Sequence, residues 1–242
     1  MRLDQALVTR GLCESRTEAQ LLIQDGSVLV NGDICSKQTR NIIDKDTIET
    51  TKRRRYVSRG GDKLEGAFLD AYGEGVYEEK AKGAVALDVG SSTGGFTDYL
   101  IQHGAVDIDA VDVGTLQLHL SLRGDERIHV YENTDIRAFV SNKQYDIIVA
   151  DLSFISLREM LPVITSFAVE GVTRFFLLIK PQFEVGKGNT KKGIVKDDAL
   201  VQEVLNTTEV LAKEFGIKSS KTFPCRIRGG DGNQEYFLYG TF

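Results

Sequence analysis

The sequence predicts an α/β protein with a small N-terminal α+β module and a larger, Rossmann-like, doubly wound domain. Its 242 residues leave room for one large domain and one small one. Within residues 59–242, short apolar runs alternate with helical stretches, as in a parallel sheet covered by helices on both faces. Residues 1–58 instead show two short helical patterns followed by a hairpin signal. We therefore expect two domains, 1–58 and 59–242.

The composition is that of a globular protein without a membrane anchor. Hydrophobic residues make up 41% of the chain and charged residues 27%, so a core can form. The longest apolar runs, such as residues 175–179, are far shorter than the roughly 18 residues of a membrane helix. The start, Met1–Gln5, contains an acid and an amide and does not look like a signal peptide. We expect no membrane partner.

The cysteines and histidines favour neither disulfides nor a metal site. Cys13, Cys35 and Cys225 are too few and too scattered for a disulfide framework or a thiolate cluster. The three histidines lack the spacing of metal ligands. We therefore expect a protein of the reducing cytoplasm with no bound metal.

The net charge of −5 hides an asymmetry along the chain. Residues 1–63 contain 12 Lys and Arg against 9 Asp and Glu, whereas the remainder contains 18 against 26. The densest basic segment consists of Lys52, Arg53, Arg54 and Arg55, with Arg59 close behind. A local patch matters more for phosphate binding than the global charge does. The segment predicts either a hinge that contacts RNA phosphates or a solvated linker.

Residues 1–50 predict two short helices and a small antiparallel sheet. Residues 3–10 have the apolar spacing of a helix, and a glycine follows. Residues 15–18 form a capping box that begins a second helix, which Gly26 ends. Residues 28–32 alternate and finish with Asn-Gly, the strongest local hairpin signal.

This first segment resembles the S-four RNA-binding domain. The resemblance rests on residues 2–4, on Ser15-Arg16 with Ala19, and on residues 26–32. Three arginines should lie on or near exposed helix ends, where guanidinium groups reach phosphate oxygens: Arg2, Arg10 and Arg16. A small helical module that contacts only protein is the competing hypothesis.

The second domain begins with a helical pattern over residues 63–72 and continues with buried strands. The apolar runs that predict parallel strands are residues 83–90, 108–113, 128–131, 145–151 and 174–180. A long amphipathic helix is expected from about 198 to 215, and residues 218–228 and 234–242 look like an antiparallel hairpin. A final hairpin of this kind is common to the methyltransferase version of the fold.

The loop after the first of these strands, residues 90–98, carries the signal for a cofactor. Its glycines allow close approach of a ligand, but their spacing is not that of the dinucleotide fingerprint. Asp88 would repel a phosphate and suits the cationic amino-acid end of S-adenosylmethionine. Asp112 is placed to bind ribose hydroxyls and Asp135 the adenine amino group. The expected cofactor-binding residues are Asp88, Gly90, Ser91, Ser92, Gly94, Gly95, Phe96, Asp112, Asp135 and Asp151. The competing hypothesis is a loop that is only a tight turn.

Six further stretches resemble the FtsJ-type ribose 2′-O-methyltransferases and, more closely, the TlyA (haemolysin A) family. They are residues 56–64, 87–98, 112–118, 151–155, 178–184 and 229–235. Thr93-Gly94-Gly95-Phe96 departs from the broader FtsJ pattern and is typical of the TlyA branch.

The resemblance implies a catalytic tetrad of Lys63, Asp151, Lys180 and Glu235. Asp151 and Lys180 independently stand at the carboxyl ends of adjacent expected strands, the edge where α/β sheets bind ligands. A ribose hydroxyl must lose its proton as it attacks a methyl group, and a lysine near carboxylates can take that proton. We expect this role for Lys180, whereas Lys63 orients the ribose. Surface ion pairs are the competing hypothesis for these residues.

A glycine- and lysine-rich stretch, residues 186–193, follows Lys180. We expect a basic loop that closes over RNA through Lys187, Lys191 and Lys192, or else a plain surface loop.

These signals together predict an S-adenosylmethionine-dependent rRNA methyltransferase that acts on a ribose 2′-hydroxyl. The TlyA resemblance implies a cytidine in 16S rRNA, 23S rRNA or both, with the 30S or 50S ribosomal subunits as partners. Among enzymes, base N-methylation is the competing hypothesis, because Asp151-Leu152-Ser153-Phe154 superficially resembles an Asp-Pro-Pro-Tyr slot. Outside that class, the chain could be a membrane-lytic protein or a non-catalytic RNA-binding factor.

Overall fold

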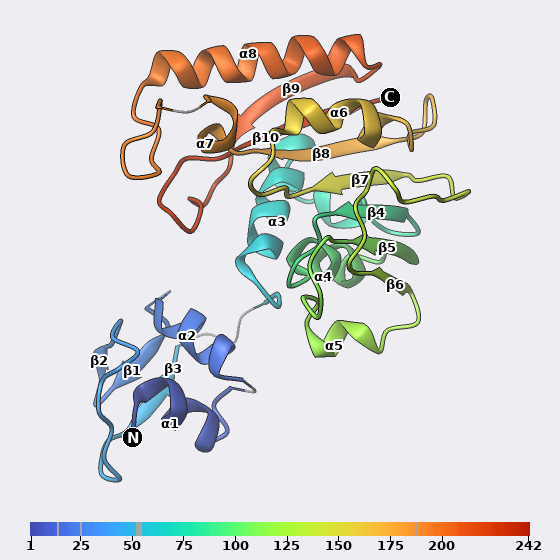
Figure 1. Ribbon diagram of the computed structural model, residues 1–242. Helices are drawn as coiled ribbons and strands as arrows, with labels where there is room; N and C mark the ends of the chain where they lie inside the picture. Colours follow the sequence, from blue (N-terminus) through green and yellow to red (C-terminus); the bar gives the residue numbers. More distant parts are fainter. Residues whose placement is uncertain (14, 25, 52–54, 187) are drawn as a thin grey trace. The chain divides into compact units, whose positions relative to one another are not determined.

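The computed structural model describes residues 1–13, 15–24, 26–51, 55–186 and 188–242. The chain divides into two compact units, Met1–Arg54 and Arg55–Phe242 (Figure 1). Tyr56, which the sequence places in the first domain, is buried in the core of the second unit. Among the described residues, no helix combines the length and apolar character needed to cross a membrane.

The first unit has the expected two helices and small sheet. Its elements are α1 (Leu3–Thr9), α2 (Arg16–Gln24), β1 (Val28–Val30), β2 (Asp33–Ile34) and β3 (Ile48–Thr50), and the sheet order is β2-β1-β3. The Ser15 hydroxyl accepts a hydrogen bond from the Glu18 amide at 3.1 Å, so the predicted cap begins α2. Asn31 and Gly32 adopt φ values of 57° and 85° in the β1–β2 turn, as a tight hairpin requires.

The second unit is built on a seven-stranded sheet of order β6-β5-β4-β7-β8-β10-β9. Its strands are β4 (Val85–Val89), β5 (Asp107–Val111), β6 (Ile128–Tyr131), β7 (Ile147–Ala150), β8 (Arg174–Ile179), β9 (Lys218–Pro224) and β10 (Tyr236–Thr241). The first five strands run parallel, and β10 is antiparallel to both β8 and β9. The predicted parallel strands and hairpin are confirmed.

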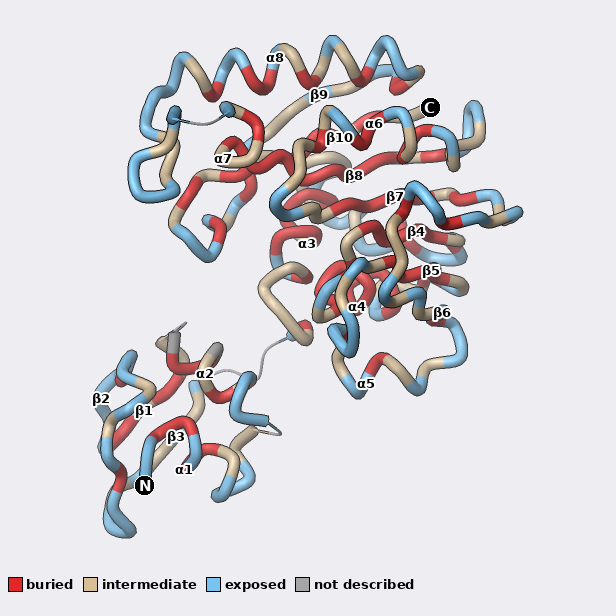
Figure 2. Tube along the Cα trace, in the orientation of Figure 1, coloured by how far each residue is buried: buried red, intermediate tan, exposed pale blue. Residues whose placement is uncertain are grey.

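Helices cover both faces of this sheet. They are α3 (Arg59–Tyr72), η1 (Tyr77–Glu79), α4 (Gly95–Gln102), α5 (Leu120–Arg123), α6 (Leu157–Thr165), α7 (Pro181–Glu184) and α8 (Asp198–Glu214). One core lies between the sheet and α3 and α4, where Phe68 stacks on Phe176 with ring centroids 4.1 Å apart. The other core joins the opposite face to α6 and α8. β4, β7 and β8 are consequently buried over nearly their whole length (Figure 2).

The strand directions gather polar residues at one edge of the sheet. β4, β5, β7 and β8 all end there, because parallel strands share their carboxyl edge. The antiparallel β10 begins at the same edge, since Tyr236 pairs with Ile179. Residues that follow β4, β5, β7 and β8 therefore lie near those that precede β10.

Candidate active site

Three neighbouring pockets open at this edge, with volumes of about 140, 550 and 470 Å³. The smallest lies at the glycine loop, the largest faces the ends of β5 and β6, and the third lies beside Lys63 and Glu235. Ser153 lines all three, and Lys180 lines the first and the third. The pockets therefore meet around Ser153 and Lys180.

The glycine loop folds as the sequence suggests, with close backbone contacts. Gly90 has φ +79°, and a Cβ there would lie 2.8 Å from the Asp151 carbonyl oxygen, so β4 and β7 leave no room for a side chain. A Cβ on Gly95 would lie 2.2 Å from Ser58 Oγ, where α4 meets the start of α3. Gly94 packs instead towards Leu118. The loop thus brings Ser58 to the smallest pocket.

Asp88 lies in the smallest pocket without a cationic partner among the described residues. Its side chain is fully buried, and one carboxylate oxygen accepts a hydrogen bond from the Thr97 hydroxyl at 2.6 Å. The other oxygen is buried with no hydrogen bond. Burial raises the pKa of Asp88 to about 7. Such a carboxylate suits a ligand that brings a positive charge.

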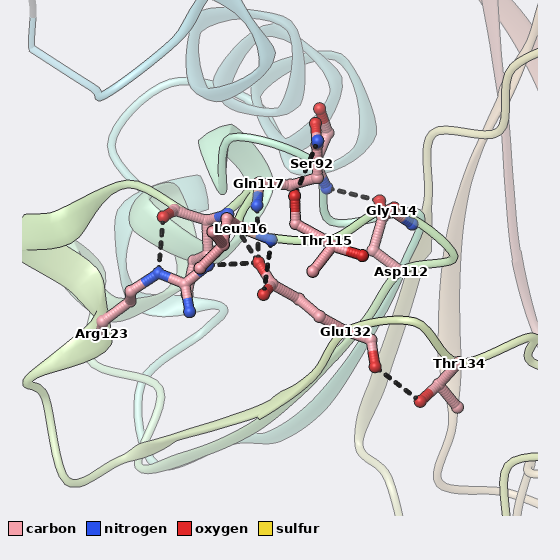
Figure 3. Close-up of polar contacts among 10 residues, drawn as sticks. Ser92, Asp112, Gly114, Thr115, Leu116, Gln117, Arg123, Glu132 and Thr134 are labelled. Carbon is pink, nitrogen blue, oxygen red and sulfur yellow. Dashed lines mark hydrogen bonds and ion pairs between the residues drawn. The ribbon is translucent and has the colours of Figure 1, made fainter.

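Asp112 and Asp135 both line the largest pocket, but their carboxylates have different hydrogen-bond partners. Asp112 accepts hydrogen bonds from the backbone amides of Ser92 at 2.8 Å and Gly114 at 2.6 Å (Figure 3). Asp135 is bonded to the side chain and backbone of Arg137, whose hydrogen bonds lower the pKa of that carboxyl to about 2. Of the ten residues expected to bind the cofactor, all except Gly94 line the smallest pocket, the largest pocket or both.

The four residues of the implied tetrad form a connected set of ion pairs. Lys180 Nζ lies 2.6 Å from Asp151 Oδ1, and Lys63 Nζ lies 4.0 Å from Asp151 Oδ2. Lys63 Nζ also lies 2.6 Å from Glu235 Oε2. Lys63, Lys180 and Glu235 are all buried. The order along the set is Lys180, Asp151, Lys63, Glu235, with lysines and carboxylates alternating.

The two lysines have different surroundings. Burial opposes the charge of Lys63, but Asp151 and Glu235 outweigh it and raise the pKa of Lys63. Lys180 pairs with one carboxylate and donates a hydrogen bond to the neutral hydroxyl of Ser153 at 2.8 Å. Lys63 is therefore held as a cation by two carboxylates. Lys180 lines the smallest pocket and is bonded to one carboxylate and one neutral hydroxyl.

An aromatic pair borders the third pocket. Phe154 is 90% exposed and adopts φ +68°, and its ring lies 5.2 Å from that of Phe183. Both residues line the pocket together with Lys63 and Lys180. A planar ring kept exposed at a pocket rim can stack on a nucleobase.

The expected RNA-binding arginines of the first unit are exposed but internally bonded. Arg2 and Arg16 both bond the buried carboxylate of Asp4, at 3.0 and 2.9 Å, with their side chains about half exposed. Arg10 donates to the carbonyls of Asp46 and Ile43. Asp4 thus fixes two guanidinium groups side by side.

The residues of the second unit that were expected to bind RNA lie in two segments. Arg55 pairs with Glu65, and Arg59 donates to the Arg228 carbonyl at 3.2 Å. Lys191 and Lys192 are exposed. The remaining residues expected to bind RNA lie outside the described residues: Lys52, Arg53, Arg54 and Lys187.

Three residues in or near the pockets have no role that the sequence predicted. They are Ser58, Ser153 and Glu132. The segment containing Ser153 stands out in the sequence, but only the geometry shows that its hydroxyl bonds Lys180. The capping position of Ser58 before α3 is a local signal that the sequence does carry. Glu132 has no such signal, because three of its contacts are to backbone amides of an irregular loop.

One group of the described residues has the geometry of metal ligands: Asp107, Asp109 and His129. The Lys143 ammonium lies 2.7 Å from Asp107 and 2.8 Å from Asp109. This lysine already supplies the positive charge that a cation would bring.

Comparison with known proteins identifies the family. The FtsJ-like methyltransferase model matches residues 56–242, and the S4 domain model matches residues 1–41. A 23S rRNA (cytidine-2'-O)-methyltransferase TlyA of Campylobacter jejuni is 39% identical, covering 99% of this chain and 98% of that protein. A 16S/23S rRNA (cytidine-2'-O)-methyltransferase TlyA of Mycobacterium tuberculosis is 40% identical, covering 98% and 88%.

A solved structure from Streptococcus thermophilus, of a protein provisionally named a hemolysin, gives the same result. It is 34% identical, with a TM-score of 0.73, and the match covers 100% of this chain and 88% of that one. The chain therefore belongs to the FtsJ-like methyltransferase family and, with its N-terminal S4 domain, to the TlyA group within that family.

Proposed function

We propose that this chain transfers the methyl group of S-adenosylmethionine to the ribose 2′-hydroxyl of a cytidine in ribosomal RNA. The observation that carries the proposal is the alternating ion-pair set of Lys180, Asp151, Lys63 and Glu235, placed where the pockets meet. The two full-length relatives named above act on a cytidine 2′-oxygen, one in 23S rRNA and one in both 16S and 23S rRNA.

The two pockets at the glycine loop fit S-adenosylmethionine. The unpaired oxygen of Asp88 suits the cationic amino-acid end, and Asp112 keeps its carboxylate beside the larger pocket for ribose hydroxyls. Asp135 and the walls around it would hold the adenine. Bound there, S-adenosylmethionine supplies an electrophilic methyl group on a sulfonium.

Lys180 is the residue we assign to the proton transfer. It lines both the smallest pocket and the third pocket, so its Nζ can contact a hydroxyl directed at the donor. Asp151 and Ser153 hold two of the directions around Nζ, which leaves a third for the ribose oxygen. In its neutral form Lys180 takes the 2′-hydroxyl proton onto Nζ. Lys63, held cationic, orients the ribose.

The first unit, residues 1–54, would provide RNA contacts, and the second unit, residues 55–242, the chemistry. Arg2 and Arg16 present fixed guanidinium groups, and Lys191 and Lys192 add charge near the third pocket. We place the reaction on the 30S or 50S subunit, without a metal, in the cytoplasm. The cysteines Cys13, Cys35 and Cys225 are free thiols, as such a compartment allows.

The test is transfer of tritiated methyl from S-adenosylmethionine to purified 30S and 50S subunits, followed by nucleoside analysis. We expect labelled 2′-O-methylcytidine, and about a 10³-fold lower kcat for Lys180→Ala. Lys213→Ala, an exposed lysine of α8, is the matched control and should retain full activity. Unchanged RNA methylation by Lys180→Ala would overturn the ribose assignment.

The same experiment separates the competing functions. Label on a base would indicate N-methylation, which the structure disfavours because both oxygens of Asp151 face lysines instead of an amine slot. Donor binding without transfer to either subunit would favour a non-catalytic RNA-binding factor. The lytic alternative needs a separate assay, in which leakage of liposomes caused by the purified chain would favour it.

A further inference from the structure

The loop between β5 and α5, residues 113–119, forms one wall of the largest pocket yet belongs to no helix or strand. Val113, Gly114 and Gln117 line that pocket. Leu116 is 81% exposed and adopts φ +53°, a conformation that costs energy for a leucine. Leu118 is buried in the core, but Val113 is exposed as Leu116 is, so little apolar burial holds the part of the wall that faces the pocket.

The carboxylate of Glu132 holds this loop by hydrogen bonds (Figure 3). It accepts hydrogen bonds from three successive backbone amides, those of Leu116 at 2.8 Å, Gln117 at 2.7 Å and Leu118 at 3.0 Å. Arg123 forms an ion pair with the same carboxylate and donates to the Leu118 carbonyl at 2.9 Å. The second half of the loop is thus fixed to one side chain.

The carboxyl group of Glu132 is ionised at neutral pH. Burial opposes its charge, but the three amides and Arg123 outweigh that effect and lower the pKa of Glu132 to about 2. Bonds to an ionised acceptor are stronger than neutral ones. A neutral side chain of the same size would weaken each of them.

The segment that carries Glu132 is also part of the pocket. Glu132 directly follows β6, and Thr134 and Asp135 line the pocket two and three residues later. The amide of Thr134 donates to the Asp112 carbonyl at 2.9 Å, and its hydroxyl donates to the Glu132 carbonyl at 3.0 Å. Glu132 consequently joins the wall after β5 to the wall after β6.

We propose that Glu132 is a positioning residue for the adenosine half of the methyl donor, which sets donor affinity without touching the donor. The inference rests on the proposed function, because it takes the largest pocket as the adenosine site. Glu132 acts through residues 113–118 and has no contact with Lys63, Lys180 or Glu235 among the interactions of the described residues.

The test is the affinity of the full chain for S-adenosylmethionine and for 5′-methylthioadenosine, measured by titration calorimetry. Glu132→Gln should weaken both by about tenfold or more, since the second ligand keeps the adenosine and lacks the amino-acid end. In methyl transfer, the KM for the donor should rise while kcat at saturating donor and the KM for RNA stay within about twofold. Glu126→Gln, an exposed glutamate nearby, is the control with the same loss of charge.

The outcomes distinguish a failure of this inference from a failure of the proposed function on which it rests. Failure of the unaltered chain to bind the donor would overturn the proposed function. Normal binding by Glu132→Gln, or a loss for S-adenosylmethionine but not for methylthioadenosine, would overturn the role of Glu132. If that variant does not fold, Arg123→Gln removes the ion pair and the Arg123 bond to the Leu118 carbonyl but leaves the three amide bonds to Glu132, and it should weaken both ligands about threefold. Unchanged affinity would then refute the role.

Discussion

Asp88, in β4, and Asp151, directly after the neighbouring strand β7, lie at the same edge of the sheet, yet their carboxylates have opposite surroundings. Asp88 is fully buried, and within the described parts of the chain its side chain is bonded only by the Thr97 hydroxyl. Asp151 is partly exposed and faces two lysine ammonium groups of this chain. One carboxylate therefore lacks a positive partner, and the other already has two. Under the proposed function, the same edge provides an acid that binds the donor and an acid that positions the catalytic lysines.

The largest effect should come from Asp151→Asn. This change leaves Lys180 without its carboxylate partner and Lys63 with only Glu235, so we expect kcat to fall about 10³-fold. Single-turnover methyl transfer at saturating donor measures this fall. A raised KM for the donor with unchanged kcat would mean that Asp151 serves the donor, as Asp88 does.

Asp88→Asn should instead act on donor binding. The isosteric amide keeps a partner for Thr97 but cannot offset a cation, so we expect about 30-fold weaker binding of S-adenosylmethionine in calorimetry. Full kcat at saturating donor would complete the contrast with Asp151→Asn. Unchanged affinity would place the cationic end of the donor elsewhere.

The pH dependence of donor affinity sharpens the same comparison. Burial raises the pKa of Asp88 to about 7 in the unliganded protein, so the ionised form that pairs with a cation gains population as pH rises. Affinity should therefore increase between about pH 6 and pH 8, and Asp88→Asn should flatten the profile. The contribution of Asp88 to unliganded stability runs the other way: it is complete below the unfolded pKa of about 4 and is lost as pH rises through about 7.

Ser153→Ala should give the smallest effect. Lys180 would lose its one neutral partner while keeping Asp151, and we expect about a tenfold fall in kcat with unchanged donor affinity. Ser153→Thr retains the hydroxyl and should recover most of the activity. Ser166→Ala, an exposed serine at the far end of α6, is the control. Equal rates for Ser153→Ala and the unaltered chain would remove Ser153 from the positioning of Lys180.

The strands, and the positions of Asp88, Asp151 and Lys180 at their ends, could be predicted because they follow from local sequence patterns. Asp88 lies near the end of an apolar run, and Asp151 and Lys180 each follow one, so the fold alone brings them to one edge. The contacts of Glu132 could not be predicted in this way. They depend on where the amides of an irregular loop lie, which apolar spacing does not determine. The pairing of Arg2 and Arg16 through buried Asp4 was hidden for the same reason.

The position of β10 has a consequence for when activity can arise during synthesis. β10 is the last of the seven strands in chain order, but it lies inside the sheet between β8 and β9, and Glu235 directly precedes it. A growing chain possesses Lys63, Asp151 and Lys180 before it possesses the carboxylate that completes the ion-pair set. Under the proposed assignment of Glu235, methyl transfer has to wait until this strand has been translated and inserted between β8 and β9.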